Sequence, residues 1–592
     1  MVTSMGQQII ADFDVPAQMR DGVVLRANIY RPASDGQWPV LLTRLPYGKD
    51  YPLSSALMDP AQVARRGYVV VIQDTRGRMT SEGDWDPMRN EIFDGADTVA
   101  WAASLPYSNG SVGMYGISYF AFTQWAAALT QPSALKAIVP MMTWNDPLNG
   151  VLFRGGALEL GSSAYWQLSV VGIDVLLRRH RANPDPRELG MALYMLVQDI
   201  DTLGTHGYAS LPLREFAPLQ RSAIAPAFFE SFDHPMDREH ADLLTIQGKH
   251  ELVQVPALNV AGWYDIFLED TIEHFRQLRS QGSTPEARQS QLLIGPWTHG
   301  GMSGAPGEMN FGFASGAALI DLKIDLTSLQ LRWFDHYLKG IDTGLTAEAP
   351  VKLFVMGANV WRDEQEWPLA RALETRYYLH SAGHAQSLSG DGLLSTSSPA
   401  AEPSDAFLYD PSTPVPTRGG ALMMTPEFRP GPFDQRSIEG RDDVLVYSTP
   451  VLEEDIEVTG PISVHLWAIS SAPDTDFVAR LVDVHPDGYA QNLTDGIIRA
   501  RYRSFTQDGQ VSLLEAGRIY EYDINLWATS NLFKKGHRIR LDITSSSFPR
   551  WDRNPNTGHD LGADSEMVVA QQTILHDAEH PSYILLPVIP VA

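Results

Sequence analysis

Short apolar runs alternate with a helix-like segment in the first 145 residues, and this alternation most constrains the fold. Runs 40–43, 68–72 and 135–139 have the length and composition of buried strands. Segment 92–103 has helical spacing, and 23–30 alternates as an edge strand does. Strands that alternate with helices form a mainly parallel sheet covered by helices. We therefore expect an α/β core.

A serine stands at the apex of one strand–turn–helix unit in this core. The apolar run 112–115 leads into Gly116-Ile117-Ser118-Tyr119, and a helix-like run follows over 120–129. Such a turn lifts the serine side chain clear of the sheet, and the helix N-terminus favours developing negative charge. Taken alone, a serine at this position is more often a helix N-cap than a nucleophile.

Two partners for a nucleophilic serine follow in the chain. A serine hydroxyl needs a base, usually His, and a carboxylate that orients the His. Asp265 comes just after the apolar run 257–261, and His299 just after 291–294. Singly, these residues are typical of a turn former and of an ordinary surface or core histidine. In the order Ser118, Asp265, His299, each after a strand, they predict an α/β-hydrolase triad.

The rest of the chain divides by character. Between 145 and 248 we find helical segments, such as 174–181 and 186–199, and an amphipathic stretch spans 319–338. After 348, short strands such as 351–355, 462–466, 477–481 and 539–543 are separated by Pro, Gly, Asp and Ser, which is typical of an all-β sandwich. We predict a discontinuous α/β-hydrolase catalytic domain (1–144 and 249–348), a helical cap (145–248) and a β-sandwich jelly-roll domain (349–592).

Charge and composition exclude several classes of partner. A net charge of −26 disfavours nucleic acid and anionic membranes, and no apolar run approaches the length of a membrane span. The chain has no cysteine, which excludes disulfides, thiolate catalysis and Cys-ligated metals. Residues 1–8 show no signal peptide, so we expect a cytoplasmic protein. The sequence does not fix the oligomeric state, and a homodimer is one state that it allows.

The motifs together resemble those of one family of serine hydrolases, which includes cocaine esterase, α-amino-acid ester hydrolases and X-Pro dipeptidyl peptidases. The cocaine esterase branch is the most similar. The matching stretches run nearly from end to end: Leu45-Pro-Tyr47-Gly-Lys49, Gln73-Asp-Thr-Arg-Gly77, Gly116-Ile-Ser-Tyr119, Gly262-Trp-Tyr-Asp265, Gly295-Pro-Trp-Thr-His299, Phe354-Val-Met-Gly357, Asp474-Thr-Asp-Phe477 and Ser547-Phe-Pro-Arg-Trp-Asp552.

The resemblance implies roles for these residues. Ser118 is implied as nucleophile, His299 as general base and then acid, and Asp265 as the orienting carboxylate. The Tyr47 hydroxyl and the Tyr119 backbone N–H are implied as oxyanion donors, although Tyr47 on its own is typical of a packed turn residue. No cofactor and no metal are implied. The chain departs from the family at Ala121, where Gly is usual, and one methyl group is expected to fit.

The segment after Asp265 indicates the acyl group. α-Amino-acid ester hydrolases carry acidic residues there, whereas this chain has Ile266-Phe267-Leu268. An ammonium group buried against Phe and Leu without a counter-charge is costly. We therefore predict a carboxylesterase for small-molecule esters with a neutral apolar or aromatic acyl group, and Phe267 as a pocket wall. By resemblance, Trp166, Met423 and Met424 also line the pocket; ordinary core packing is the equal alternative.

Two other functions stay open at this point. The same scaffold serves an amidase, an acylase or an α-amino-acid ester hydrolase, and only substrate assays separate these. Outside enzymes, the chain could be a carbohydrate-binding protein with an inert hydrolase core, which an intact triad disfavours.

Overall fold

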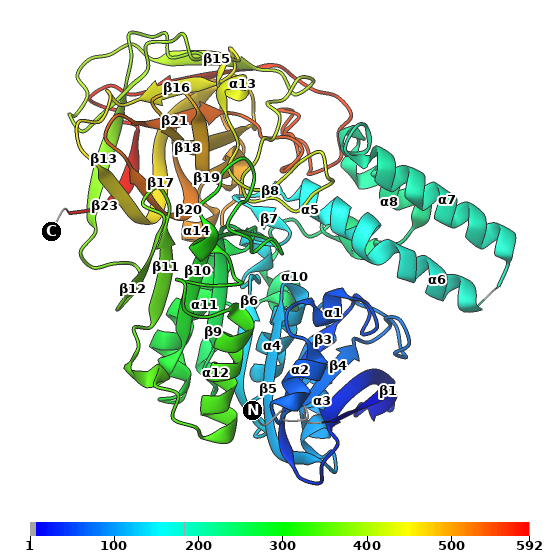
Figure 1. The fold of residues 1–592 in the computed structure, drawn as a ribbon. Helices are drawn as coiled ribbons and strands as arrows, with labels where there is room; N and C mark the ends of the chain where they lie inside the picture. Colours follow the sequence, from blue (N-terminus) through cyan, green and yellow to red (C-terminus); the bar gives the residue numbers. More distant parts are fainter. Residues whose placement is uncertain (1–7, 183, 591–592) are drawn as a thin grey trace.

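Two large β-sheets and a helical segment, which is inserted between two strands of the first sheet, make up most of the molecule (Figure 1). The computed structural model describes residues 8–182 and 184–590. Residues 1–7, most of the segment in which no signal peptide is expected, lie outside the described residues.

The first sheet has ten strands and forms the α/β core. Neighbouring strands pair in parallel from β4 to β11, with antiparallel strands at both ends. The order across the sheet is β1 (Ile9–Gln18), β2 (Val24–Pro32), β4 (Val69–Asp74), β3 (Trp38–Leu45), β5 (Ser108–Ile117), β6 (Leu135–Met141), β9 (Leu258–Tyr264), β10 (Gln291–Thr298), β11 (Val351–Val355) and β12 (Val360–Glu364).

Helices cover this sheet and confirm the expected α/β class. Gly95 of one helix lies against Ala127 of the next, and Phe334 packs over Gly113 of β5. Small residues at both contacts let the helix and strand backbones approach closely. The helices of this part are α1 (Leu53–Ala56), α2 (Pro60–Arg65), α3 (Glu91–Ala103), α4 (Tyr119–Ala128), α11 (Leu268–Gln281) and α12 (Leu326–Lys339).

The chain between β6 and β9 is mainly helical, as expected for a cap. Helices α6 and α7 form a hairpin that projects from the body of the molecule (Figure 1), and they contain the predicted segments 174–181 and 186–199. The elements are the short hairpin β7 (Phe153–Arg154) and β8 (Ala157–Leu158), then α5 (Leu160–Tyr165), a π-helical segment (Trp166–Val171), α6 (Gly172–Ala182), α7 (Pro186–Leu203), α8 (Ala217–Ser222), α9 (Pro226–Glu230) and α10 (Arg238–Ala241).

One stretch of this cap is long and apolar enough to cross a membrane by length and composition. It is the continuous helix Leu160–Arg181. Of its most apolar stretch of 18 residues, 44% is buried inside the protein. Because core helices of ordinary proteins meet the same criterion, the finding does not identify a membrane span. The expected absence of a membrane partner stays a prediction.

The second sheet has eleven strands and confirms an all-β C-terminal part. Its strands pair antiparallel apart from the single β14–β16 contact. They are β13 (Leu373–His380), β14 (Leu393–Ser395), β15 (Asp405–Tyr409), β16 (Leu445–Ser448), β17 (Ile456–Ser470), β18 (Asp476–Val484), β19 (Ala490–Arg499), β20 (Ile519–Phe533), β21 (Arg538–Thr544), β22 (Ala570–Leu575) and β23 (Tyr583–Ile589). The jelly-roll topology stays a prediction.

Two strand assignments made from sequence are wrong. Segment 351–355, assigned to the β-domain, is β11, and its Val351 pairs in parallel with Leu292 of the first sheet. Segment 23–30, assigned to an edge, lies in β2 between β1 and β4. In both cases the local pattern of a strand does not say which strand lies beside it. The predicted boundary at 349 therefore falls before the first sheet is complete, and the three-domain division stays a prediction.

Candidate active site

Ser118 occupies the sharp turn between β5 and α4. Its backbone has φ +60°, a conformation that is uncommon for a residue with a side chain. Gly116 has φ +146°, and a Cβ there would overlap the Phe120 side chain. Ala121 is fully buried in α4, so the extra methyl group is accommodated. The turn holds Ser118 at the carboxyl edge of the sheet.

Asp265 and His299 follow directly after two neighbouring strands, β9 and β10, and meet there. The His299 Nδ1 and an Asp265 carboxylate oxygen, Oδ2, are 2.7 Å apart. The other carboxylate oxygen, Oδ1, accepts the Phe267 backbone N–H at 2.8 Å. Asp265 is fully buried. A carboxylate held at both oxygens fixes the histidine tautomer that carries its proton on Nδ1 and leaves Nε2 free to accept one.

Tyr47 lies two residues after the end of β3, beside the serine turn. Its hydroxyl oxygen accepts the indole N–H of Trp166 at 2.9 Å. Burial raises the pKa of Tyr47 to about 12, against smaller lowering effects from hydrogen bonds with Trp166 and Ser118. The phenol therefore stays protonated at neutral pH, and because its oxygen accepts from Trp166, its own proton is available for another acceptor.

Tyr119 is the first residue of α4, so its backbone N–H has no acceptor within the helix. Its side chain is buried, with the hydroxyl donating to Glu91 at 2.9 Å and accepting from the Met88 N–H at 2.8 Å. The ring stacks on Trp166 at 14° between planes. These contacts hold the start of the helix in place next to Ser118.

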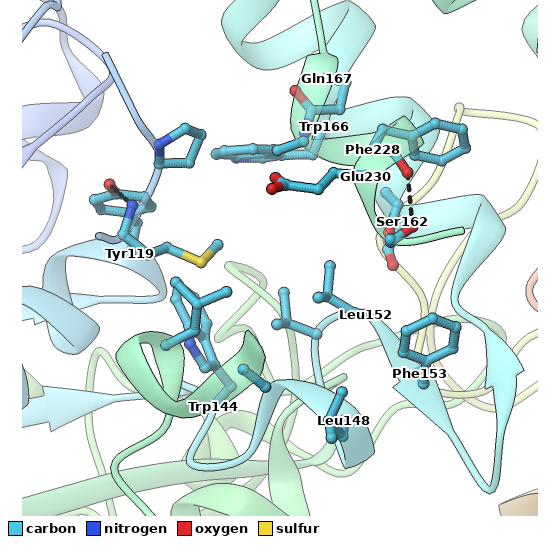
Figure 2. Close-up of a pocket in the computed structure, with 18 of the residues that line it drawn as sticks. Tyr119, Trp144, Leu148, Leu152, Phe153, Ser162, Trp166, Gln167, Phe228 and Glu230 are labelled. Atoms are coloured by element: carbon cyan, nitrogen blue, oxygen red, sulfur yellow. Dashed lines mark hydrogen bonds between the residues drawn. The ribbon is translucent and has the colours of Figure 1, made fainter. Parts of the chain in front are cut away.

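A largely apolar cavity of about 110 Å³ lies between this edge of the sheet and the cap (Figure 2). Engineered apolar cavities of similar order hold one benzene ring. Ser118, Tyr47 and Tyr119 line it on the side of the β5–α4 turn. Its apolar walls include Trp144, Leu148, Val151, Leu152, Phe153, Leu158, Trp166, Phe228, Leu244, Ile266, Phe267 and Met423.

The structure places three of the four predicted pocket residues at the cavity. Trp166, Phe267 and Met423 line the cavity. Met424 is not among the described residues that line it; it is buried against Gly161 of α5, and its assignment to the substrate pocket stays a prediction. The ring of His299 lies edge-on to Phe267, 5.3 Å between centroids.

A group of charged residues at this cavity was not predicted from the sequence. Figure 2 shows the carboxylate of Glu230 pointing into the cavity near the Trp166 ring. Glu230 pairs with Arg89 at 3.3 Å and lies 3.8 Å from His240. These residues come from the loop before α3 and from the cap, far from Ser118 in sequence, so no local motif indicates them.

Comparisons with known proteins identify the family. Residues 21–301 match the sequence model of X-Pro dipeptidyl-peptidase (S15 family), and 343–585 match that of the X-Pro dipeptidyl-peptidase C-terminal non-catalytic domain. Cocaine esterase of Rhodococcus sp. (strain MB1 Bresler) is 39% identical over 582 residues, which cover 97% of this chain and 98% of that protein.

Solved structures give the same picture of the fold. An aminopeptidase from the marine sediment archaeon Thaumarchaeota archaeon has 25% identity and a TM-score of 0.78, covering 99% of this chain and 97% of that one. A selenomethionine-labelled α-amino acid ester hydrolase has 24% identity and a TM-score of 0.79, covering 99% and 98%. The second likeness shows the fold alone.

Proposed function

This chain belongs to the X-Pro dipeptidyl-peptidase (S15) family and is a serine hydrolase acting on esters, and from that premise we propose that it cleaves carboxylic esters with a neutral apolar or aromatic acyl group. One observation carries the proposal. Ser118 stands in a strained strand-to-helix turn on the wall of a cavity whose other walls are mainly apolar. An acyl group next to the serine would therefore be surrounded by Leu, Phe and Trp side chains.

We propose that Ser118, His299 and Asp265 form the catalytic triad. The Ser118 Oγ attacks the ester carbonyl carbon while its proton passes to His299 Nε2. His299 then gives that proton to the departing alkoxide, which leaves as the alcohol. A water molecule, deprotonated by the same histidine, cleaves the acyl-enzyme and returns the serine. The 2.7 Å contact between His299 and the buried Asp265 supports the role of the carboxylate in orienting the imidazole.

We propose that the oxyanion is stabilised by the Tyr47 hydroxyl and the Tyr119 backbone N–H. Two observations support this assignment: the Tyr47 proton is not used toward Trp166, which is itself the donor, and Tyr119 begins α4. Preorganised donors of this kind lower the barrier by roughly 3 kcal/mol each. No part of this mechanism requires a cofactor, and the substrate partner is a small-molecule ester. A cytoplasmic location stays a prediction.

A second candidate function is favoured by one observation, the Glu230 carboxylate in the cavity. It could accept the ammonium group of an α-amino-acid ester or amide, as the predicted alternatives require. Glu230 is, however, already paired with the Arg89 guanidinium at 3.3 Å. A carboxylate neutralised in this way attracts a substrate cation less strongly, which is why the neutral acyl group is proposed first.

The test is a panel of initial rates with the wild type and Ser118→Ala side by side. The panel holds short acyl, long acyl and benzoyl esters, a phenylglycine methyl ester and the corresponding anilides. We expect turnover to favour neutral esters and to fall at least about 10⁴-fold in Ser118→Ala. Turnover near wild type in this variant would remove Ser118 as nucleophile. A preference for the phenylglycine ester or the anilides would replace the first proposal by the second.

A further inference from the structure

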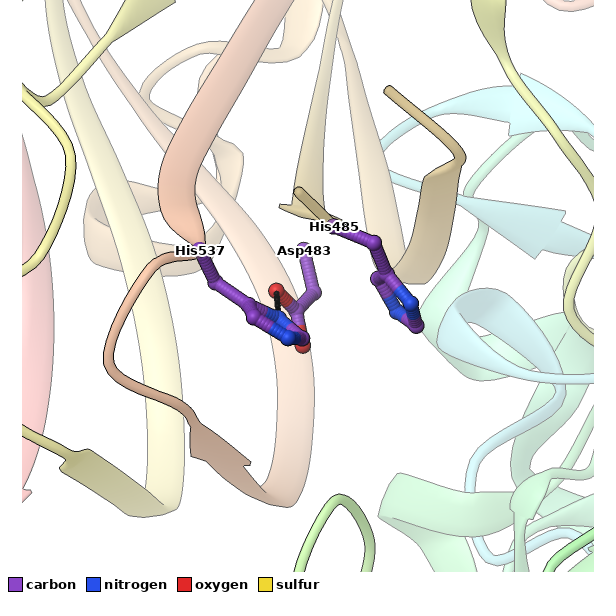
Figure 3. Close-up of side chains that lie close together, drawn as sticks. All are labelled: Asp483, His485 and His537. Atoms are coloured by element: carbon purple, nitrogen blue, oxygen red, sulfur yellow. Dashed lines mark hydrogen bonds and ion pairs between the residues drawn. The ribbon is translucent and has the colours of Figure 1, made fainter. Parts of the chain in front are cut away.

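The β18–β19 hairpin and the connection from β20 to β21, both in the C-terminal domain, bring three potential metal ligands together, away from the cavity. Asp483 lies near the end of β18, and His485 directly follows that strand. His537 precedes β21, which pairs antiparallel with β18 through Val484 and Arg538. Each of the three residues offers one ligand atom, and these atoms lie within 4.8 Å of one another. Figure 3 shows the His537 ring against the Asp483 carboxylate, with the His485 ring beside them.

Neighbouring groups orient the three side chains. His537 Nδ1 and Asp483 Oδ1 are 2.7 Å apart, and the second carboxylate oxygen accepts the Asn531 side-chain amide at 3.2 Å. The imidazole rings of His485 and His537 have centroids 4.5 Å apart. On its outer side, the His485 Nε2 is 3.3 Å from Oε1, the side-chain amide oxygen of Gln491. If the His485 Nε2–H donates to Gln491, Nδ1 carries no proton and is available as a metal ligand. Metal-binding histidines are commonly oriented by such a hydrogen bond from their other ring nitrogen.

We propose that Asp483, His485 and His537 bind a divalent transition-metal ion, with Zn²⁺ as the ion that this set suits. Two imidazole nitrogens and one carboxylate oxygen are ligands that zinc takes, with water in the fourth tetrahedral position. The ligand atoms of such a site lie roughly 3–3.5 Å apart. The widest pair, separated by up to 4.8 Å, therefore needs to close by up to about 1.3–1.8 Å. The half-buried His485 ring, at the end of its strand, supplies that movement.

The position of the site indicates a structural role. Gln491, which contacts His485, also donates to the Tyr264 hydroxyl at 3.4 Å, and Tyr264 directly precedes Asp265. A metal ion held by the β18–β19 hairpin and the β20–β21 connection would thus fix the β-domain surface against which the end of β9 packs. It lies outside the cavity, so it would stabilise the fold and take no part in ester cleavage.

The simplest alternative is an ordinary Asp483–His537 ion pair with His485 beside it. Isothermal titration of tag-free, chelator-treated protein with ZnCl₂ distinguishes the two. We expect one saturable zinc site per chain in the wild type, weakened at least 30-fold in both His485→Gln and His537→Gln. Under the same conditions MgCl₂, which prefers oxygen ligands, should give no saturable binding. Cobalt(II) bound at the site should show the intense visible absorption of tetrahedral coordination.

A matched control is available in the same domain. His465 also has carboxylate partners, Asp523 and Glu521, each at 2.9 Å, but they lie on opposite ring nitrogens and cannot share one ion with it. His465→Gln should therefore keep the wild-type zinc affinity. Absence of saturable zinc binding in the wild type overturns the proposal, as does equal affinity in His485→Gln and His465→Gln. Loss of zinc protection against thermal unfolding in His485→Gln, with an unchanged circular dichroism spectrum, supports it.

Discussion

At the residue scale, Tyr47 is the side chain whose surroundings bear most directly on catalysis. Its oxygen accepts from Trp166, so its proton is free for an oxyanion. We predict that Tyr47→Phe lowers kcat by roughly 10²–10³ while changing KM little, because the lost donor acts mainly on the transition state. The control is Tyr208→Phe, a buried cap tyrosine that donates to the Gly161 carbonyl at 3.0 Å. Steady-state kinetics on a benzoyl ester measure both, and an unchanged kcat in Tyr47→Phe would remove it from the oxyanion hole.

The raised pKa of Tyr47 has a consequence for the pH profile. An ordinary tyrosine loses its proton near pH 10, and as an anion it could no longer donate to the oxyanion. Burial raises the pKa of Tyr47 to about 12, so the donating form persists above the ordinary value. We predict that kcat stays on its alkaline plateau up to pH 10. Rates corrected with Ser118→Ala as blank test this, and a fall by half between pH 9 and 10 would contradict it.

Glu230 separates the two candidate functions. Methyl phenylacetate and phenylglycine methyl ester differ by one ammonium group next to the same ring. Because Glu230 is already paired with Arg89, we predict that Glu230→Gln changes kcat/KM for the neutral ester by less than about threefold, and for the cationic ester by no more than that. A selective loss of tenfold or more on the phenylglycine ester, about 1.4 kcal/mol, would show that Glu230 binds the ammonium group and would favour the second function.

At the scale of elements, the β5–turn–α4 unit depends on Gly116. A Cβ at this position would overlap the Phe120 side chain, and φ +146° suits glycine. We predict that Gly116→Ala lowers the urea midpoint of unfolding and ester turnover together, with a loss of about 1–3 kcal/mol of stability from strain. Gly190 is the control, since it lies exposed in α7 and a methyl group added there would meet nothing within 4 Å.

In Gly190→Ala the same chemical change should stabilise the protein by about 0.5–1 kcal/mol, because alanine is the better helix former. Urea unfolding followed by circular dichroism compares the two variants. Equal effects of both substitutions would show that the turn has room for a side chain, and would remove Gly116 from this argument.

The elements themselves were largely predictable from local pattern. The buried strands β3, β4, β6, β9 and β10 are short apolar runs, and α3, α6 and α7 have helical spacing, because periodicity reflects which face of an element is buried. Pairing is not local: 351–355 has the same apolar pattern whether it extends the first sheet or the second, and its partner Leu292 is far away in sequence. Strand β1 was missed for a different reason: most of its residues are half-buried or exposed, so its apolar alternation is weak.

Some residues of the candidate site were predictable from local pattern, and others depend on tertiary packing. Ser118, Asp265 and His299 were predictable because each directly follows a strand of the parallel sheet, and strand ends gather at one edge. Glu230 reaches the cavity because the cap folds over that edge, and Met424 is not among the described residues that line it. The position of a cap residue depends on tertiary packing, which no spacing in one sequence records.

At the scale of the whole molecule, Arg154 connects the cap to the β-domain. Its guanidinium donates to the Asp495 carbonyl at 2.6 Å and lies 3.4 Å from the centre of the Trp527 ring. Arg154 is the last residue of β7, and its side chain is fully buried against strands β19 and β20. Gly155 next to it accepts the Arg499 backbone N–H at 2.8 Å. The start of the cap is thus built into the C-terminal domain, and the two should unfold together.

We predict that Arg154→Met uncouples these parts. Methionine retains most of the apolar stem, but the charge, the hydrogen bond and the cation–π contact are lost, and removing one member of a buried polar network costs about 3 kcal/mol. The wild type should lose tryptophan fluorescence and esterase activity at one urea concentration, whereas the variant should lose activity first. Arg187→Met, on the exposed start of α7, should keep the wild-type midpoint within about 0.5 kcal/mol. A single, unshifted transition in Arg154→Met would mean that the cap is held to the catalytic domain by other contacts, and that this arginine is not what joins the cap to the β-domain.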